Sequence, residues 1–411
     1  MSRRLRIAIA SALILLGLGL LLVLGFVSLT HTRFGQDRVR AMVTSMLKGR
    51  VHGHVYVGRI TGGFFNGATI DSLEIRDDED SLVVATGPVR VSYDARDLFD
   101  RRILLSYVNV QRPRVVLREH ENGDWNYRRV FPASAEKRQR NQRGFGDFIV
   151  IDSADVIDAT LRLTMAWRPN HALRGAALDS AIRFDLTRSD LEIRRTSEGF
   201  ARTRHWTGAD AKLGYVRLAD PDSTGRFATI RDLKVAESDP PFNFRNLRGT
   251  ALHLGDSVWV KGTHWDLPAS TGTAKGKVVW GSDLPVRYDV HVIGDSVSLN
   301  DVAWVYPTLP RTGGGKMELD IRTARNPDFL DFIITKMDVR TTRSHLTGNM
   351  TYRIGGDMLI VKDVALEAEP VNFDLLRTLS GKPFPYDWQG DITGSVRATG
   401  GPLNHFRVEQ S

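Results

Sequence analysis

The chain has 411 residues, of which 42% are hydrophobic, with a formal net charge of +8 and no cysteine. The absence of cysteine excludes disulfides, thiolate metal sites and cysteine nucleophiles, so stability must come from apolar burial and strand pairing. The basic residues are spread along the whole chain. This favours contact with an anionic membrane surface over nucleic acid, which needs a concentrated basic stripe, and no nucleic-acid partner is expected.

The first predicted element is a membrane anchor within residues 1–30. Residues 7–29 read IAIASALILLGLGLLLVLGFVSL and carry no charge. As a helix rising about 1.5 Å per residue they would be roughly 34 Å long, enough to cross a hydrocarbon core of about 30 Å. Arg3, Arg4 and Arg6 favour a short cytoplasmic N-terminus, although Arg33, Arg38 and Arg40 lie near the far end.

The anchor residues that we single out are Ile7, Leu13, Leu16, Leu20, Leu24 and Leu29. The alternative to a retained anchor is a cleaved secretory signal, which should have a shorter apolar run followed by small residues in an A-x-A-like pattern. No such pattern follows here. In either case we expect the rest of the chain to lie outside the cytoplasm.

Residues 31–50 predict an amphipathic helix beside the membrane. Val39, Met42, Val43, Met46 and Leu47 recur at helical spacing, and Gly49 is a typical helix stop. This helix either lies on the membrane or caps the core of the next domain.

From about residue 51 the period of the apolar residues changes to two, which indicates half-buried strands with one dry and one wet face. Such alternation is typical of antiparallel sheets. The predicted dry positions are Ile157, Leu161, Leu163 and Met165; Ile182, Phe184 and Leu186; Val286, Tyr288, Val290 and Val292; and Met317, Leu319 and Ile321. Helices are few and short, at 94–101, 299–306 and 372–379.

Degenerate repeats accompany the strands. The spacing Ile70-x-x-Leu73 recurs as Ile230-x-x-Leu233 and Val361-x-x-Val364, and predicts a β-bulge or a strand junction, because an interval of three changes faces unless one residue is absorbed. The basic stretch 133–146 predicts a flexible loop, either simply solvated or contacting lipid headgroups. It divides an N-terminal β unit, 51–132, from β repeats over 147–411.

Motifs for catalysis or metal binding are missing. His52 and His54 have no third ligand at suitable spacing, and residues 77–80, Asp-Asp-Glu-Asp, read as a solvated hairpin turn rather than a calcium loop. We therefore expect a protein that is not an enzyme and needs no cofactor or metal.

Several motifs together resemble the AsmA-like and TamB-like family of bacterial lipid transfer proteins. These are the anchor, the short helix ending at Gly49, Val57-Gly-Arg-Ile60, Asn122-Gly-Asp-Trp125-Asn126, and the closing alternation from Gly390 to Gly400. The resemblance implies an elongated antiparallel sheet curled into an open half-tube with an apolar interior. It also implies attachment to the inner membrane of bacteria with two membranes, a periplasmic body, and phospholipid transport toward the outer membrane.

One departure from the family is the missing C-terminal domain of TamB-like members. Either the chain is a short member or a fragment, or an outer-membrane protein or a second groove protein supplies the far end.

The expected function is thus binding and conduction of phospholipid acyl chains on the apolar strand faces. One alternative is an assembly factor that offers its sheet edge to outer-membrane β-barrel proteins by β-augmentation. Another is a closed sandwich or barrel whose apolar face is only a core.

Overall fold

A computed structural model describes residues 51–131 and 147–400, except for 63–65, 95, 98–99, 101, 168–173, 188–191, 198, 240, 242, 281–285, 305–307, 328, 356–357 and 381–387. It also describes residues 37, 40, 41, 44 and 407–409. The predicted anchor at 7–29 and the basic loop at 133–146 lie outside these residues. No helix among the described residues is long and apolar enough to cross a membrane.

Four residues of the helix predicted over 31–50 are described, and all four are helical: Asp37, Arg40, Ala41 and Thr44. The guanidinium of Arg40 donates a hydrogen bond of 2.7 Å to the carbonyl of Val57 in the first strand. The described part of this helix is therefore tied to the start of the β unit.

The fold is mainly β, and the described residues form one large sheet of 23 strands. Its N-terminal part consists of long strands that are each interrupted midway, so that two labelled strands follow one another in line. These are β1 (His54–Val57) with β2 (Ile60–Thr61), β3 (Gly67–Ile70) with β4 (Leu73–Arg76), β5 (Leu82–Thr86) with β6 (Val89–Tyr93), β7 (Ile103–Gln111) with β8 (Arg114–Arg118), and β9 (Ile149–Ile151) with β10 (Ala154–Trp167). The motif Ile70-x-x-Leu73 is the junction of β3 and β4, as predicted.

The sheet is mostly antiparallel, as expected, but it contains parallel pairings at one place. β9 and β10 run parallel to β7 and β8, with Leu105 opposite Ile151 and Leu161 opposite Val115. A tight hairpin would have made the next strand antiparallel to the one before it. A long connection that contains helix α4 (Asn126–Val130) joins the strands instead, which allows the next strand to run in the same direction.

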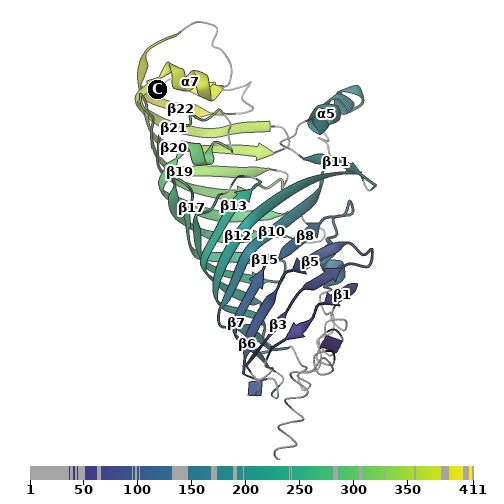
Figure 1. The fold of residues 1–411 in the computed structure, drawn as a ribbon. Coiled ribbons are helices and arrows are strands. Elements are labelled where there is room, and N and C mark those ends of the chain that lie inside the picture. The colour runs from purple at the N-terminus through teal and green to yellow at the C-terminus, as the bar shows by residue number, and fades with distance from the viewer. Residues whose placement is uncertain are drawn as a thin grey trace, which may run out of the picture.

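The remaining strands form an antiparallel meander, with β11 pairing beside the first residues of β12. Their bounds are β11 (Ile193–Thr196), β12 (Gly199–Ala219), β13 (Arg226–Ser238), β14 (Asn246–Leu254), β15 (Ser257–Asp266), β16 (Thr271–Val279), β17 (Arg287–Ser298), β18 (Gly314–Thr323), β19 (Leu330–Arg340), β20 (His345–Gly355), β21 (Met358–Asn372), β22 (Asp391–Thr399) and β23 (Arg407–Glu409). In Figure 1 these strands rise one above another toward the C-terminal end, while the long β10 and β12 run obliquely across them.

The predicted bulges are present in this meander. Asp232 and Ile230 of β13 pair with consecutive residues of β12, which leaves Arg231 as the extra residue. Asp363 and Val361 of β21 likewise pair with consecutive residues of β20, which leaves Lys362 unpaired. Each bulge keeps the apolar residues before and after it on one face.

The strand predicted around Ile182, Phe184 and Leu186 is wrong, because these residues belong to helix α5 (Ala176–Thr187). Leu178, Ala181 and Ile182 also fit helical spacing, and a short alternating run cannot exclude a helix. Phe184 is 64% exposed in this helix. Of the helix predicted at 94–101, the described residues Arg96 and Asp97 are helical. Helix α6 (Leu299–Val302) is shorter than expected, and α7 (Phe373–Ser380) lies one residue from its predicted position.

A fully buried apolar cluster lies at the N-terminal end of the sheet. Its members are Val51, Val55, Val57, Ile60, Ile75, Val83 and Val130. Val130 comes from α4 and is 0% exposed, so this short helix closes the end of the first strands. Burying such side chains stabilises the unit by about 1.5 to 3 kcal/mol each.

Candidate apolar binding face

An uninterrupted apolar row crosses ten consecutive strands, from β12 to β21. Residues directly opposite one another in antiparallel strands share a face, so the register defines the row. Its members, in order, are Val216, Ala228, Ala251, Val260, Gly276, Val290, Ile321, Phe332, Tyr352 and Val361. None of them carries a charge.

Two further apolar rows run beside the first, on the same face. The second consists of Ala274, Val292, Leu319, Ile334, Met350, Val364 and Ala398. The third consists of Gly272, Gly294, Met317, Met337, Gly348, Leu366 and Val396. We call the face that carries these three rows the apolar face.

Five of the residues singled out in the sequence lie together in these rows: Val290, Val292, Met317, Leu319 and Ile321. Tyr288 continues the same face of β17, and Val286 lies just before that strand with 41% of its surface exposed.

Three more predicted residues extend the apolar face into β10. Leu161, Leu163 and Met165 pair with Trp206, Arg204 and Arg202 of β12. Ile157 does not belong to this set. It lies at an irregularity of β10, where Asp158 has a φ of 55°, and it is 44% exposed.

The sequence analysis missed the C-terminal part of the face, including Phe332, Met350, Tyr352 and Val364. The alternations Leu330-x-Phe332-x-Ile334 and Met350-x-Tyr352-x-Ile354 are the signals that could have found it. The rings of Phe332 and Tyr352 stack with centroids 5.0 Å apart. Burial raises the pKa of Tyr352 to about 12, so this phenol stays neutral and fits an apolar surface.

Most side chains in the three rows are only partly buried. Val290, Val292, Leu319, Ile321 and Phe332 all keep an intermediate exposure. Described strands contact mainly their hydrogen-bonded neighbours. A second layer packed on this face would bury such residues almost completely. A cluster of fully buried apolar residues lies in the N-terminal unit, whereas in the three rows only some side chains, such as Val216, Ile334 and Ala398, are buried.

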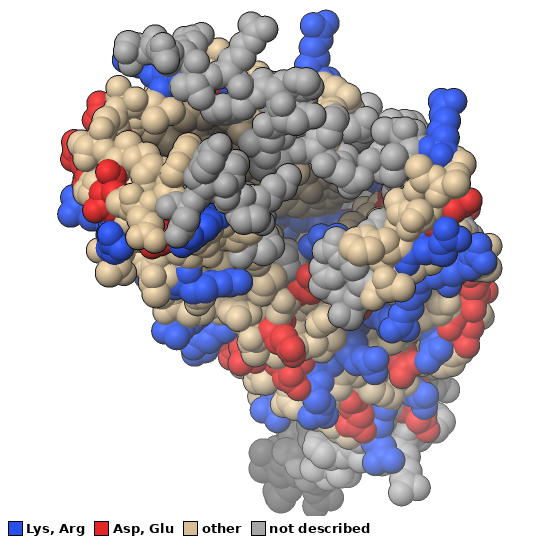
Figure 2. All heavy atoms as spheres, turned by 90° about the horizontal axis from the view of Figure 1, so that it is seen from above, with Lys and Arg blue, Asp and Glu red and all other residues tan. Residues whose placement is uncertain are grey.

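The opposite face is charged and alternates in sign. One row runs through Lys277, Asp289, Arg322, Asp331 and Arg353, each opposite the next in register. The guanidinium of Arg322 lies 3.8 Å from the Asp289 carboxylate. Figure 2 shows blue and red side chains interspersed over the outside of the molecule. The charged face is therefore suited to contact with solvent.

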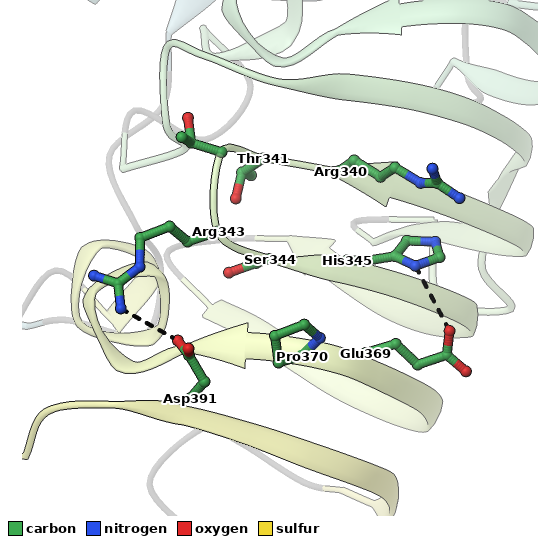
Figure 3. A pocket seen from close by; sticks show the side chains of 9 residues that line it. Arg340, Thr341, Arg343, Ser344, His345, Glu369, Pro370 and Asp391 are labelled. Atoms are coloured by element: carbon green, nitrogen blue, oxygen red, sulfur yellow. Dashed lines mark ion pairs between the residues drawn. The ribbon is translucent and has the colours of Figure 1, made fainter.

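A separate polar pocket of about 450 Å³ lies at the turn between β19 and β20. Arg340, Arg343, Ser344, His345, Glu369 and Asp391 line it (Figure 3). Arg343 lies 3.5 Å from Asp391, and His345 lies 3.7 Å from Glu369. The Arg343–Asp391 pair is exposed, whereas the His345 side chain is mostly buried. Arg340 lies 3.7 Å from Asp338, which is outside the pocket lining.

The two histidines and the acidic turn considered in the sequence analysis form no joint site. His52 and His54 are both exposed. The Asp77 carboxylate accepts hydrogen bonds from the backbone N–H groups of Glu79 and Ser81, at 3.1 and 2.7 Å, within the β4–β5 turn. The described part of the chain contains no group of three or more potential metal ligands.

Comparison of the chain with protein-family models, with curated proteins and with solved structures finds no match.

Proposed function

We propose that the apolar face is the floor of an open groove that binds the acyl chains of phospholipids and conducts them between two membranes. The observation that carries this proposal is the uncharged row across ten strands, in which every side chain except that of Val216 remains partly exposed. Exposed apolar surfaces larger than a few hundred Å² usually mark binding sites. Each CH₂ group that leaves water gains about 0.8 kcal/mol, so a lipid with two chains has a large drive to settle there.

The curvature of the sheet supports an open groove. β10 and β12 cross obliquely over the later strands in Figure 1, and a recess is visible from above in Figure 2. The rows run across the strands and therefore along the stack. Because none of the residues in the three rows carries a charge, an acyl chain moving along the stack would meet few barriers, while its headgroup stays in water.

The sequence supports a membrane setting for the groove. The uncharged stretch 7–29 would hold the N-terminal end in the inner membrane of a bacterium with two membranes, with the sheet in the periplasm.

A pair of matched double variants tests the groove. Ala274→Asp with Met350→Asp places two carboxylates in the second row, on β16 and β20. The control, Thr273→Asp with Asn349→Asp, changes the adjacent, exposed residues of the same two strands. Native mass spectrometry of gently solubilised protein counts bound lipids, and circular dichroism monitors the strands.

We expect the inner variant to keep its strand content but to lose bound phospholipid by at least about tenfold, because desolvating a charge beside acyl chains is costly. The control should retain its lipids. Unchanged lipid occupancy, or unchanged phospholipid flux in cells, in the inner variant would count against the groove.

The edge strand β22 supports a second candidate function, that of an assembly factor for outer-membrane β-barrel proteins. β23 pairs only with Arg397, Ala398 and Thr399, so residues 391–396 have no described partner on that side. Residues 392–396, Ile-Thr-Gly-Ser-Val, contain neither charge nor proline, and edges without such protection readily accept another strand. Photo-crosslinkers at Thr393 and Ser395 should capture barrel precursors if this function holds, whereas crosslinkers at Val292 and Met350 should capture lipid if the groove holds.

A further inference from the structure

The charged face differs between its two halves. From β17 to β20 its basic side chains lie beside carboxylates, and Arg322, for example, pairs with both Asp289 and Asp320. From β12 to β16 four basic side chains on this face form no ion pair with any described residue: Arg217, Lys261, Lys275 and Lys277. This half therefore carries positive charge that the described residues do not neutralise.

The register places these cations around an apolar group. One row across β12 to β16 consists of Arg217, Phe227, Leu252, Trp259 and Lys277, each opposite the next. It begins and ends with a cation and is apolar in between. Lys261 and Lys275 lie two residues from Trp259 and Lys277 along their strands, and therefore on the same face. None of these positions holds a carboxylate.

The apolar group reaches solvent at the ends of the strands. Tyr215 is 42% exposed, and Leu254 is 43% exposed. The ring centroid of Tyr215 lies 6.1 Å from that of Phe227, and the Lys277 ammonium lies 4.9 Å from the centre of the Trp259 ring. Single exposed apolar residues are common, but these two adjoin a contiguous aromatic and aliphatic group. We call the five-residue row with Tyr215, Leu254, Lys261 and Lys275 the basic patch.

The basic patch begins beside the N-terminal unit of the sheet. Arg217 lies opposite Val150 of β9, and Val150 lies opposite Leu104 of β7. Figure 1 labels β7, together with β3 and β6, at the lower end of the molecule. The predicted anchor at 7–29 precedes this unit in the chain.

We infer that the basic patch binds the anionic surface of the membrane that holds the predicted anchor. Lys and Arg side chains are attracted to anionic headgroups, and tyrosine and tryptophan rings favour the level of the headgroups. The exposed Tyr215 and Leu254 favour a bilayer over an acidic protein segment, because a bilayer offers an apolar layer directly below its charges. This inference goes beyond the proposed function, since it concerns the outer face of the sheet and requires no lipid in the groove.

Labels at single cysteines test this contact, and the chain has no cysteine of its own. An environment-sensitive fluorophore is attached at Tyr215→Cys or Leu254→Cys in the full-length protein, with Thr335→Cys, an exposed position of β19, as the control site. The protein is reconstituted into nanodiscs of phosphatidylcholine, alone or mixed equally with phosphatidylglycerol. Quenching by lipids that carry a nitroxide near the headgroup reports a label at the interface. The same labels are read in native membrane vesicles.

Two matched double variants test the charges. Lys261→Gln with Lys275→Gln removes two exposed cations of the basic patch, whereas Lys316→Gln with Lys336→Gln removes two exposed cations from β18 and β19. Circular dichroism checks that each variant keeps its strands.

We expect the labels at Tyr215→Cys and Leu254→Cys to be quenched in the mixed nanodiscs and the label at Thr335→Cys to stay in water. Each cation near an anionic surface favours contact by roughly fivefold, so the patch variant should lower the ratio of bound to free patch by at least about tenfold. The control variant should change this ratio by less than about twofold.

Equal quenching at the patch and at the control site would overturn the inference. Quenching that depends neither on phosphatidylglycerol nor on Lys261 and Lys275 would do the same, as would a chain that does not associate with nanodiscs of either composition. Shielding of the labels only in native vesicles would assign the patch to a protein partner instead. Loss of lipid from the groove would contradict the proposed function and leave this contact unaffected.

Discussion

The carboxylate of Asp331 accepts two hydrogen bonds from the guanidinium of Arg353, at 2.6 Å from Nε and 2.8 Å from Nη2. The ammonium of Lys362 lies 3.6 Å from the same carboxylate. The pair stands on the charged face, one residue along β20 from Tyr352 on the apolar face. Adjacent residues of one strand thus lie on opposite faces of the sheet, one charged and one apolar.

Because of this ion pair, the stability of the fold depends on pH. The hydrogen bonds from Arg353, and secondarily the charge of Lys362, lower the pKa of Asp331 against the opposing effect of desolvation. A lowered pKa in the folded state stabilises the fold above the unfolded-state pKa of about 3.9, and that stabilisation disappears as the pH falls through the folded-state pKa. Asp331→Asn should therefore be less stable than wild type at pH 7, and the difference should shrink below about pH 4. Urea unfolding at several pH values measures this, with the exposed Asp295→Asn as a control that should show no such change.

A comparison of two valine truncations tests whether the apolar face is open. Val83 is 1% exposed in the N-terminal cluster, whereas Val292 is only partly buried in the second row. Val83→Ala should cost about 1 to 3 kcal/mol, because it removes buried methyl groups and leaves a cavity. Val292→Ala should cost less than about 1 kcal/mol in lipid-free protein, because water already reaches that site. Equal losses in denaturant unfolding would indicate a face that is packed rather than open.

The sequence predicted the strands correctly where the alternation continues without an irregularity, whereas the longest run, Ile157–Met165, contains a bulge that excludes Ile157 from the apolar face. Val286–Val292 and Met317–Ile321 lie in β17 and β18, apart from Val286 itself, and their dry positions share one face because strands have a period of two. The intervals of three at Ile230 and Val361 also predicted irregularities that the register confirms.

Other features depend on contacts that local patterns do not encode. Ile182–Leu186 fits both periods, and its helix was missed because five residues cannot discriminate between them. The parallel pairing of β7 with β10 follows from where a long connection returns the chain.

The turns on one side of the sheet contain a repeated hydrogen bond. The hydroxyl of Ser270 accepts a bond of 2.8 Å from the backbone N–H of Ser298, and the hydroxyl of Ser344 accepts one of 3.0 Å from Asn372. In both cases the partner lies 28 residues further on, at the start of a helix. Ser270 and Ser344 are both buried. These equivalent bonds indicate that β15 to α6 and β19 to α7 are two copies of one structural unit.

If the two units are equivalent, the hydrogen bonds to Ser270 and Ser344 should contribute equally to the stability of the protein. Ser270→Ala and Ser344→Ala should each destabilise the protein by about 1 to 3 kcal/mol, since a shielded backbone N–H loses its acceptor. Asn372→Ser, which installs the residue found at the corresponding position of the first unit, should retain the bond from its own N–H to Ser344. Thermal or urea unfolding gives the comparison. A loss confined to one of the two serine variants would contradict the equivalence of the units.

Removing the bulge residue Lys362 should be far more damaging than changing its side chain. Lys362 is the extra residue that lets Val361 and Val364 lie on the same face of β21. Its deletion would shift the register by one residue on one side of the bulge, and such a shift moves side chains to the other face of the sheet. Either Val364 and Leu366 or Val361 would then lie on the charged face. Lys362→Ala keeps the backbone and loses only the ion pair with Asp331, so it should cost less than about 1 kcal/mol. Hydrogen exchange should show lost protection across β20, β21 and β22 in the deletion variant and near wild-type protection in Lys362→Ala. If the deletion variant kept its protected strands, the three apolar rows would not depend on this register, and the continuity of the groove would have to rest on something else.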